Sequence, residues 1–235
     1  MTESRYDRAA DFYVAGWPDS YDDPASSALL SVLGPVRGRS VLDVACGHGR
    51  YTREILRLGG SPVVGLDMSP ELIRRARALE DQEPLGARYV CADLATADEL
   101  STGAFDRVVC GFGLSDVDDL GGAIATVARV LAPGGRFVFS ILHPCFPGSA
   151  GVSGSWPLGG RYYDEQLWFA EGAASTLRNQ VGANHRTVST YLNTLIDHGL
   201  VVDRVVEPEP TGDWALRWPG AAALPLYLVI GCTNG

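Results

Sequence analysis

The segment Ser40–Arg50, with the sequence SVLDVACGHGR, is the feature that most constrains what this chain can fold into. Val41–Val44 is a short, largely apolar run, which is typical of a buried strand. Gly47 and Gly49 follow it, and Tyr51–Leu58 then has apolar residues at helical spacing. We therefore predict a strand, a tight glycine turn and a helix, the unit from which open parallel sheets are built.

A second apolar run ends at Asp67, about twenty residues after Gly47. A carboxylate at that position can accept both hydroxyls of a ribose, and the glycines let a ligand approach main-chain atoms that a Cβ would block. A dinucleotide fingerprint would have a third glycine where Thr52 stands, so the spacing argues against an NAD-dependent oxidoreductase. The pattern is instead DxxxGxG, beginning at Asp43. It predicts a site for an adenosine-type ligand.

This pattern resembles the class I S-adenosylmethionine-dependent methyltransferases. In that family, the acidic residue that matches Asp43 and the small loop hold the methionine end of the cofactor. The residue that matches Asp67 binds the ribose, and its neighbour, here Met68, packs on the adenine. The first glycine of the family is Ala45 in this chain, which is a mild change. The resemblance implies S-adenosyl-L-methionine as cofactor and S-adenosyl-L-homocysteine as product.

Further motifs of the family follow in the same order. Arg88–Leu94 resembles the third strand, Phe105–Leu114 the fourth, and Leu131–Ser140 carries the PGG turn before the fifth. Leu200–Val206 and Pro225–Cys232 would form the antiparallel hairpin that ends the fold. The resemblance assigns these residues to the cofactor: Asp43, Ala45, Cys46, Gly47, Asp67, Met68, Asp93, Leu94 and Phe112.

The expected fold is a doubly wound α/β domain over residues 1–235, with a mostly parallel seven-stranded sheet in the order 3-2-1-4-5-7-6. Residues 1–31 would form a helical cover, and residues 143–184 a lid inserted after the fifth strand. A helix is predicted from about His185, with Asn184 as its cap. Another helix is predicted over Pro70–Glu80, capped by Ser69.

Two histidines are candidates for a general base, because an imidazole titrates near neutral pH. His143 follows the fifth strand, and His185 begins the predicted helix. The alternatives are a turn residue bonded to the backbone for His143, and packing or capping at a helix start for His185. Six residues are predicted to contact the substrate: Tyr6, Tyr13, Trp17, Tyr163, Trp168 and Arg186. The alternatives are a local aromatic core for the rings and a surface ion pair for Arg186.

Charge and composition limit the partners. The chain has a net charge of -9 at pH 7, with no lysine and with its arginines spread along the sequence, which argues against nucleic acid as a partner. Five cysteines without paired spacing are typical of a reduced cytosolic protein, and they predict neither a disulfide framework nor a metal site. The N-terminus has no apolar targeting core. We expect a cytoplasmic monomer or homodimer that does not bind membranes.

The resemblance predicts methyl transfer from S-adenosylmethionine to a small molecule or short peptide. The segment from the HPCF turn to the last strands resembles the bacterial small-molecule branch of the family, which favours a role in the biosynthesis of a natural product. The alternative is a methyltransferase-like protein that binds the cofactor but catalyses another reaction, such as a cyclisation, or senses a ligand.

Overall fold

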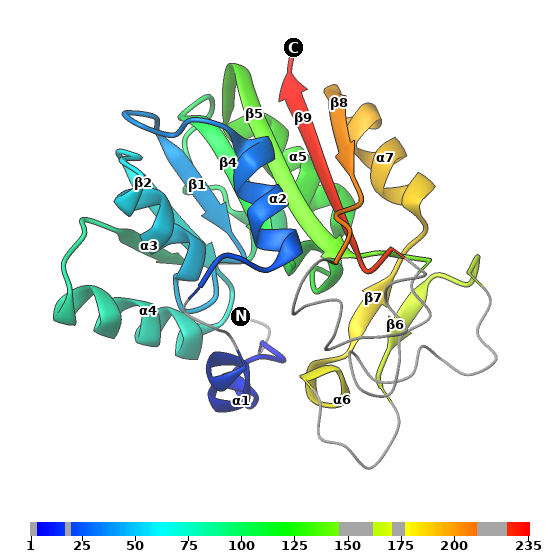
Figure 1. Ribbon diagram of the computed structural model, residues 1–235, viewed down its shortest axis with the longest axis horizontal. Helices are drawn as coiled ribbons and strands as arrows, with labels where there is room; N and C mark the ends of the chain where they lie inside the picture. Colours follow the sequence, from blue (N-terminus) through cyan, green and yellow to red (C-terminus); the bar gives the residue numbers. More distant parts are fainter. Residues whose placement is uncertain (1–3, 17–19, 146–161, 171–176, 211–224) are drawn as a thin grey trace.

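The computed structural model describes residues 4–16, 20–145, 162–170, 177–210 and 225–235. Its centre is a seven-stranded sheet in the order β3-β2-β1-β4-β5-β9-β8 (Figure 1). The strands are β1 (Val41–Val44), β2 (Val63–Asp67), β3 (Arg88–Cys91), β4 (Phe105–Gly111), β5 (Leu131–Leu142), β8 (Leu200–Val206) and β9 (Tyr227–Asn234). The first five are parallel, and β9 is antiparallel to both β5 and β8. Because β8 and β9 are the sixth and seventh strands of this sheet, the predicted fold and strand order are confirmed.

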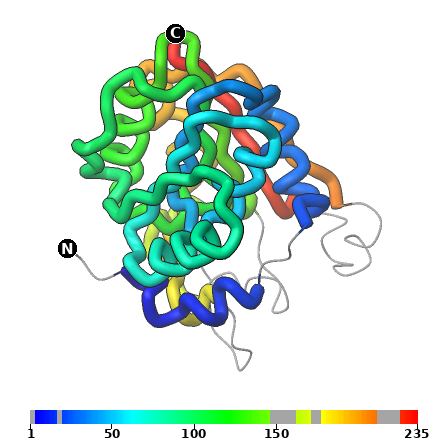
Figure 2. Tube along the Cα trace, turned by 90° about the vertical axis from the view of Figure 1, so that its left-hand side faces the viewer, coloured from blue at the N-terminus to red at the C-terminus, as the bar shows by residue number. Residues whose placement is uncertain are grey.

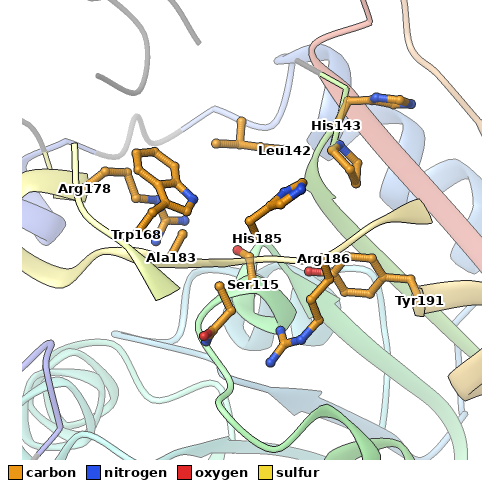
Figure 3. A pocket seen from close by; sticks show the side chains of 11 residues that line it. Ser115, Leu142, His143, Trp168, Arg178, Ala183, His185, Arg186 and Tyr191 are labelled. Carbon is orange, nitrogen blue, oxygen red and sulfur yellow. The ribbon is translucent and has the colours of Figure 1, made fainter. Parts of the chain in front are cut away.

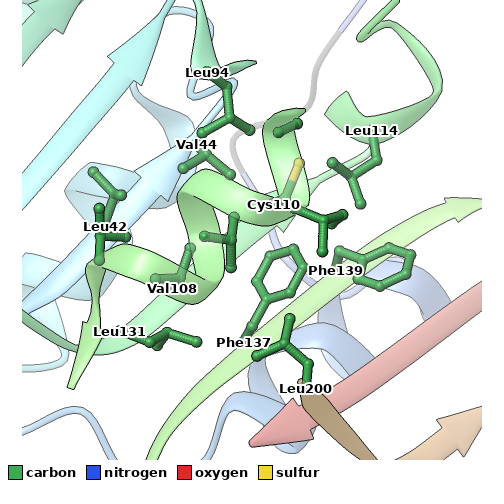
Figure 4. Close-up of a cluster of buried hydrophobic side chains, with 14 of the residues drawn as sticks. Leu42, Val44, Leu94, Val108, Cys110, Leu114, Leu131, Phe137, Phe139 and Leu200 are labelled. Carbon is green, nitrogen blue, oxygen red and sulfur yellow. The ribbon is translucent and has the colours of Figure 1, made fainter. Parts of the chain in front are cut away.

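Helices cover both faces of the sheet, as the continuous apolar strands require. On one face lie α2 (Pro24–Leu33) and α3 (Arg50–Arg57), which pack on alternate strand residues such as Val41 and Val109. On the other lie α5 (Leu120–Val130) and α7 (Val188–Asp197), which bury the main core around Phe137 and Phe139 (Figure 4). Successive residues of each central strand therefore point alternately into the core on one face of the sheet and the core on the other.

The predicted helix over Pro70–Glu80 is present as α4 (Pro70–Gln82). Its first turn begins with Pro70, and the side chain of Ser69 accepts a hydrogen bond from the N–H of Leu72. These are the local signals from which the helix start was predicted. The helix packs against β3 through Ile73 and Ala76.

The predicted start of the last helix is wrong. His185 belongs to a strand, β7 (Ala183–His185), which pairs with β6 (Gln166–Trp168) in a separate two-stranded sheet. The helix α7 begins at Val188, and its cap is Thr187, whose side chain accepts from the N–H of Thr190. Asn184 is engaged elsewhere, because its side-chain amide donates to the carbonyl of Val117. Tertiary pairing therefore removes three residues from the expected helix.

Four short elements complete the described chain at the carboxyl ends of the parallel strands. The helices α1 (Ala10–Ala15) and α6 (Leu177–Val181) lie side by side at that end in both views (Figures 1 and 2). The 3-10 turn η2 (Gly113–Ser115) follows β4, and η1 (Leu94–Thr96) follows β3. No helix among the described residues is long and apolar enough to cross a membrane. The domain limits of 1–31 and 143–184 stay predictions.

Candidate active site

The loop after β1 has a left-handed backbone at three positions. The φ angles are 54° at Ala45, 59° at Gly47 and 88° at Gly49. A left-handed residue with a Cβ costs roughly 1–2 kcal/mol, which accounts for the glycine that the family has where this chain has Ala45. The methyl group of Ala45 also leaves no room for a side chain at the first residue of η2, because a Cβ on Gly113 would lie 2.3 Å from the Cβ of Ala45. The loop and η2 are thus in direct contact.

Asp67 joins the end of β2 to this loop. Its Oδ2 accepts the N–H of Gly47 at 2.8 Å, and its Oδ1 accepts the N–H of Ser69 at 2.8 Å. Burial raises the pKa of Asp67 to about 6, although both hydrogen bonds oppose the shift. A carboxylate oxygen can accept more than one hydrogen bond. The arrangement therefore leaves acceptor capacity for the hydroxyls of a ribose beside the glycine loop.

Asp43 is buried beneath the same loop, with 1% of its surface exposed. Its Oδ2 accepts the hydroxyl of Thr52 at 2.6 Å, so the residue in place of the third glycine serves to hold this carboxylate. Its Oδ1 has no hydrogen-bond partner among the described residues. Burial raises the pKa of Asp43 to about 7. A buried, unpartnered carboxylate oxygen fits a site that receives a polar ligand group.

Asp43→Asn is expected to stabilise the free protein at high pH. Because the pKa of Asp43 is raised on folding, the folded state binds more protons than the unfolded state between about pH 4 and 7, and stability falls as the pH rises through that window. The asparagine does not titrate. Urea unfolding should show the variant gaining roughly 1–3 kcal/mol on the wild type between pH 5 and pH 8. An equal difference at both pH values would contradict the raised pKa.

The other residues assigned to the cofactor differ in their exposure. Met68 is 37% exposed and Asp93 is exposed, so both are accessible to a ligand. Cys46 is buried, which holds the pKa of its thiol well above the usual value. The side chain of Leu94 lies in the main core, so a contact with the cofactor would involve its main chain. Phe112 has a φ of 64° and donates its N–H to the carbonyl of Ser140 at 3.0 Å.

Tyr13 of the N-terminal segment lies against the loop, and Tyr6 packs on Tyr13. The hydroxyl of Tyr13 lies 2.7 Å from the place that a Cβ would take on Gly47. The ring of Tyr13 meets His48 edge-on at 5.7 Å and Tyr6 edge-on at 5.3 Å, both measured between ring centroids. The structure thus places Tyr13 against the cofactor loop, and its predicted contact with a substrate stays a prediction. Trp17 lies outside the described residues.

A pocket of about 440 Å³, part of it open solvent, lies between η2, the end of β5 and the strand β7. It brings together four residues predicted from the sequence, His143, His185, Trp168 and Arg186 (Figure 3). Tyr163 is not among its lining residues and is 73% exposed. Sequence reasoning missed the other lining side chains: Ser115, Leu142, Pro144, Arg178, Ala183, Asn184 and Tyr191. They come from segments far apart in the chain, and no local pattern groups them.

Both ring nitrogens of His143 have partners. Nδ1 accepts the N–H of Cys145 at 3.0 Å, which leaves the proton on Nε2, 3.0 Å from Oε1 of Glu207. Burial lowers the pKa of His143, whereas Glu207 raises it. This geometry favours the alternative of a turn residue, because proton abstraction by Nδ1 would break the bond to Cys145.

His185 is buried, and its ring points into the pocket (Figure 3). Nε2 lies 2.8 Å from the carbonyl of Tyr162, so this nitrogen carries the proton and donates it. The ring also meets that of Tyr162 edge-on at 5.8 Å. Because its ring points into the pocket, His185 is in place to contact a molecule bound there.

Arg186 forms no surface ion pair with the described residues. It is buried, and its guanidinium donates to the carbonyls of Leu114, Val117 and Asp118 at 3.1, 2.6 and 2.9 Å. These bonds hold the chain from η2 onward against β7. Among the residues that the structure describes, no carboxylate lies within 4.0 Å of this guanidinium. Its predicted contact with a substrate stays a prediction.

Comparisons with known proteins agree with this geometry. Residues 42–139 match the family described as a methyltransferase domain. The solved structure of an S-adenosylmethionine-dependent methyltransferase from Mesorhizobium loti is 31% identical, with a TM-score of 0.73, over 90% of this chain and 98% of that one. The chain belongs to the S-adenosylmethionine-dependent methyltransferases. The predicted family and cofactor class are thereby confirmed.

Curated relatives of this methyltransferase match a shorter part of it. A ubiquinone biosynthesis O-methyltransferase from Xanthomonas oryzae pv. oryzae is 34% identical over 136 residues, which is 52% of this chain and 56% of that protein. A demethylmenaquinone methyltransferase from Tropheryma whipplei is 36% identical over 112 residues, or 47% of this chain and 45% of that protein. The chain thus spans about half the length of the curated relatives that it matches. Within its described part, no three metal-ligating side chains are grouped to hold an ion.

Proposed function

We propose that this chain transfers the methyl group of S-adenosylmethionine to a small molecule bound in the pocket beside η2. The observation that carries the proposal is the position of η2 between the two sites. Its first residue, Gly113, packs on Ala45 of the glycine loop, and its last residue, Ser115, lines the pocket. A cofactor on the loop and an acceptor in the pocket would therefore meet across three residues of backbone.

The residues present fit the cofactor. Asp67 would hold the ribose, the unpartnered Oδ1 of Asp43 would receive a polar group at the methionine end, and the exposed Met68 would pack on the adenine. When bound, the cofactor supplies a sulfonium-activated methyl group. The chain's own task is then to align the acceptor and exclude water, which can account for most of the acceleration.

The pocket favours a small acceptor. Part of its roughly 440 Å³ is open solvent, so the enclosed space is small. Among the described residues, its lining includes Trp168, Arg178, His185 and Arg186 but no aspartate or glutamate. Arg178 is paired with Asp116, so the uncompensated positive charge of this wall is that of Arg186, and it suits an acceptor with an acidic or anionic oxygen. A natural-product acceptor, as predicted from the sequence, belongs to this proposal, and the names of the curated relatives make quinone precursors the other class to test.

Calorimetry with S-adenosylmethionine, S-adenosylhomocysteine and NAD tests the cofactor, and mass spectrometry of an acceptor panel tests the reaction. We expect the first two ligands to bind and NAD not to bind. Acceptor products should gain a methyl group with release of an equal amount of S-adenosylhomocysteine. An acceptor that is converted without that release would indicate a non-methylating reaction such as a cyclisation.

His185→Ala is expected to lower kcat by roughly 10²-fold if the acceptor must lose a proton, with unchanged affinity for S-adenosylhomocysteine. His143→Ala should have a smaller effect, because both nitrogens of His143 already have partners. The matched control is His198→Ala, since His198 lies at the end of α7, away from the pocket lining, with Nδ1 of its ring 2.8 Å from the carbonyl of Thr194. Equal losses from all three substitutions would argue against a role in proton transfer.

A further inference from the structure

We propose that Asp116 is a positioning residue that connects Tyr6, in the N-terminal segment beside the glycine loop, to Arg178 in the wall of the acceptor pocket. Binding of the cofactor at the loop would then also order that wall. The inference rests on the proposed function, because it takes the glycine loop as the cofactor site. Asp116 caps the end of η2 and is mostly buried. Sequence reasoning did not single it out.

The carboxylate of Asp116 bonds to both the N-terminal segment and the pocket wall. Oδ2 of Asp116 accepts the hydroxyl of Tyr6 at 2.8 Å. Oδ1 accepts from Nη1 of Arg178 in an ion pair. The main-chain carbonyl of Asp116 also accepts from Nη2 of Arg5 at 2.9 Å. Segments more than one hundred and sixty residues apart, around Tyr6 and Arg178, are therefore connected through a single side chain.

The connection continues to the cofactor loop. Tyr6 packs edge-on against Tyr13, and the Tyr13 hydroxyl lies against Gly47. Burial, together with the charge of Asp116, holds the pKa of Tyr6 well above its usual value, so the phenol stays protonated and remains a donor to Asp116. Gly47 in turn donates its N–H to Asp67. A ligand that contacts Tyr13 at the loop would therefore restrain the ring that packs on Tyr6, and Tyr6 is bonded to Asp116.

The connection also continues to the pocket. Arg178 is 8% exposed and lines the pocket together with Ala183. The same Nη1 that pairs with Asp116 donates to the carbonyl of Gly182 at 2.8 Å, directly before β7. A buried guanidinium that loses its carboxylate is strongly destabilised. The position of Arg178, and with it the start of β7, therefore depends on Asp116.

A second tie between the same segments is exposed and provides the control. Asp118 accepts from Nη1 of Arg5 and from Nδ2 of Asn184, both at 2.9 Å, but 72% of its side chain is exposed. Exposed ion pairs contribute little, because solvent screens them. Loss of Asp118 should thus leave the coupling intact, whereas loss of Asp116 should remove it.

Hydrogen exchange of the full chain, followed by mass spectrometry with and without saturating S-adenosylhomocysteine, tests the inference. In the wild type, the ligand is expected to slow exchange in residues 43–50 and also in residues 177–186. Tyr6→Phe and Asp116→Asn should each keep the effect at residues 43–50 and reduce the ligand-dependent effect at residues 177–186 at least about threefold. Asp118→Asn should change neither. The readout is the difference made by the ligand, which a merely structural role would not alter.

Other exchange patterns would overturn either the coupling through Asp116 or the cofactor site itself. Protection confined to residues 43–50 in the wild type, or retained at 177–186 in both Tyr6→Phe and Asp116→Asn, would overturn the coupling while leaving the proposed function intact. No protection at residues 43–50 in the wild type would overturn the cofactor site itself, and the coupling with it. If Asp116→Asn does not fold, Tyr6→Phe decides, because it removes one hydroxyl group and keeps the Arg178–Asp116 ion pair.

Discussion

Asp67→Ala is expected to weaken the binding of S-adenosylhomocysteine at least ~10-fold, because charge-assisted hydrogen bonds are worth roughly 1.5–3 kcal/mol. The substitution removes the predicted partner of the ribose. It also removes the acceptor of the N–H of Gly47, which shapes the loop on which the ligand would lie. Isothermal calorimetry at pH 7.5 measures the change directly. A loss below two-fold would rule out the ribose assignment.

The same side chain predicts a pH dependence. Burial raises the pKa of Asp67 to about 6, so most of the carboxyl groups are protonated at pH 5 in the folded protein. Only the ionised form is a full acceptor at both oxygens. Affinity for S-adenosylhomocysteine should therefore rise from pH 5 to pH 7.5 in the wild type and less so in Asp67→Asn. Asp81→Ala, at an exposed position of α4, is the control that should retain both affinity and pH dependence.

Gly111→Ala is expected to destabilise the fold by roughly 2–3 kcal/mol, because overpacking a core forces neighbours out of place. A Cβ at this position of β4 would lie 2.1 Å from Cε2 of Tyr51. That ring has little freedom to move, since it is buried and its hydroxyl lies 2.6 Å from the Oγ of Ser26. The guanidinium of Arg50 also lies over the ring, 5.1 Å from its centroid.

Urea unfolding measures this change, and Gly121→Ala supplies a matched control. Gly121 lies in α5, where a Cβ would meet only Asp119 Oδ1 at an ordinary 3.6 Å. A helical glycine costs roughly 0.5–1 kcal/mol relative to alanine, so this variant should be slightly more stable than the wild type. Equal effects of the two substitutions would contradict the contact between Gly111 and Tyr51.

Several features of the fold could be predicted because their signals are local. The start of α4 is signalled by the cap Ser69 and by Pro70 directly after it. In the loop after β1, left-handed positions are occupied by Gly47 and Gly49. Apolar strand segments alternate along the chain with segments whose apolar residues have helical spacing, and this alternation predicts a doubly wound sheet. The seven-stranded order followed from the family resemblance, not from spacing alone.

Local pattern failed where a distant segment competes for the same residues. The sequence from His185 favours a helix, yet pairing with β6 makes His185 a strand residue, and the helix begins at Val188 with Thr187 as its cap. The ring of His143 is bonded to Cys145 and to Glu207, the second of them more than sixty residues away, and its role as a base stays a prediction. Contacts of that kind depend on chain closure over long distances, and composition and spacing do not encode them.

By itself, the sequence determined the glycine loop and the individual buried strands, because backbone conformation and strand burial depend on neighbours a few residues apart. The tertiary structure alone decided which side chains share the acceptor pocket and that Asp116 connects Tyr6 to Arg178. Those residues come from the N-terminus, the loop after β4 and the segment before β7. They meet only because the carboxyl ends of parallel strands bring those segments to one edge of the sheet.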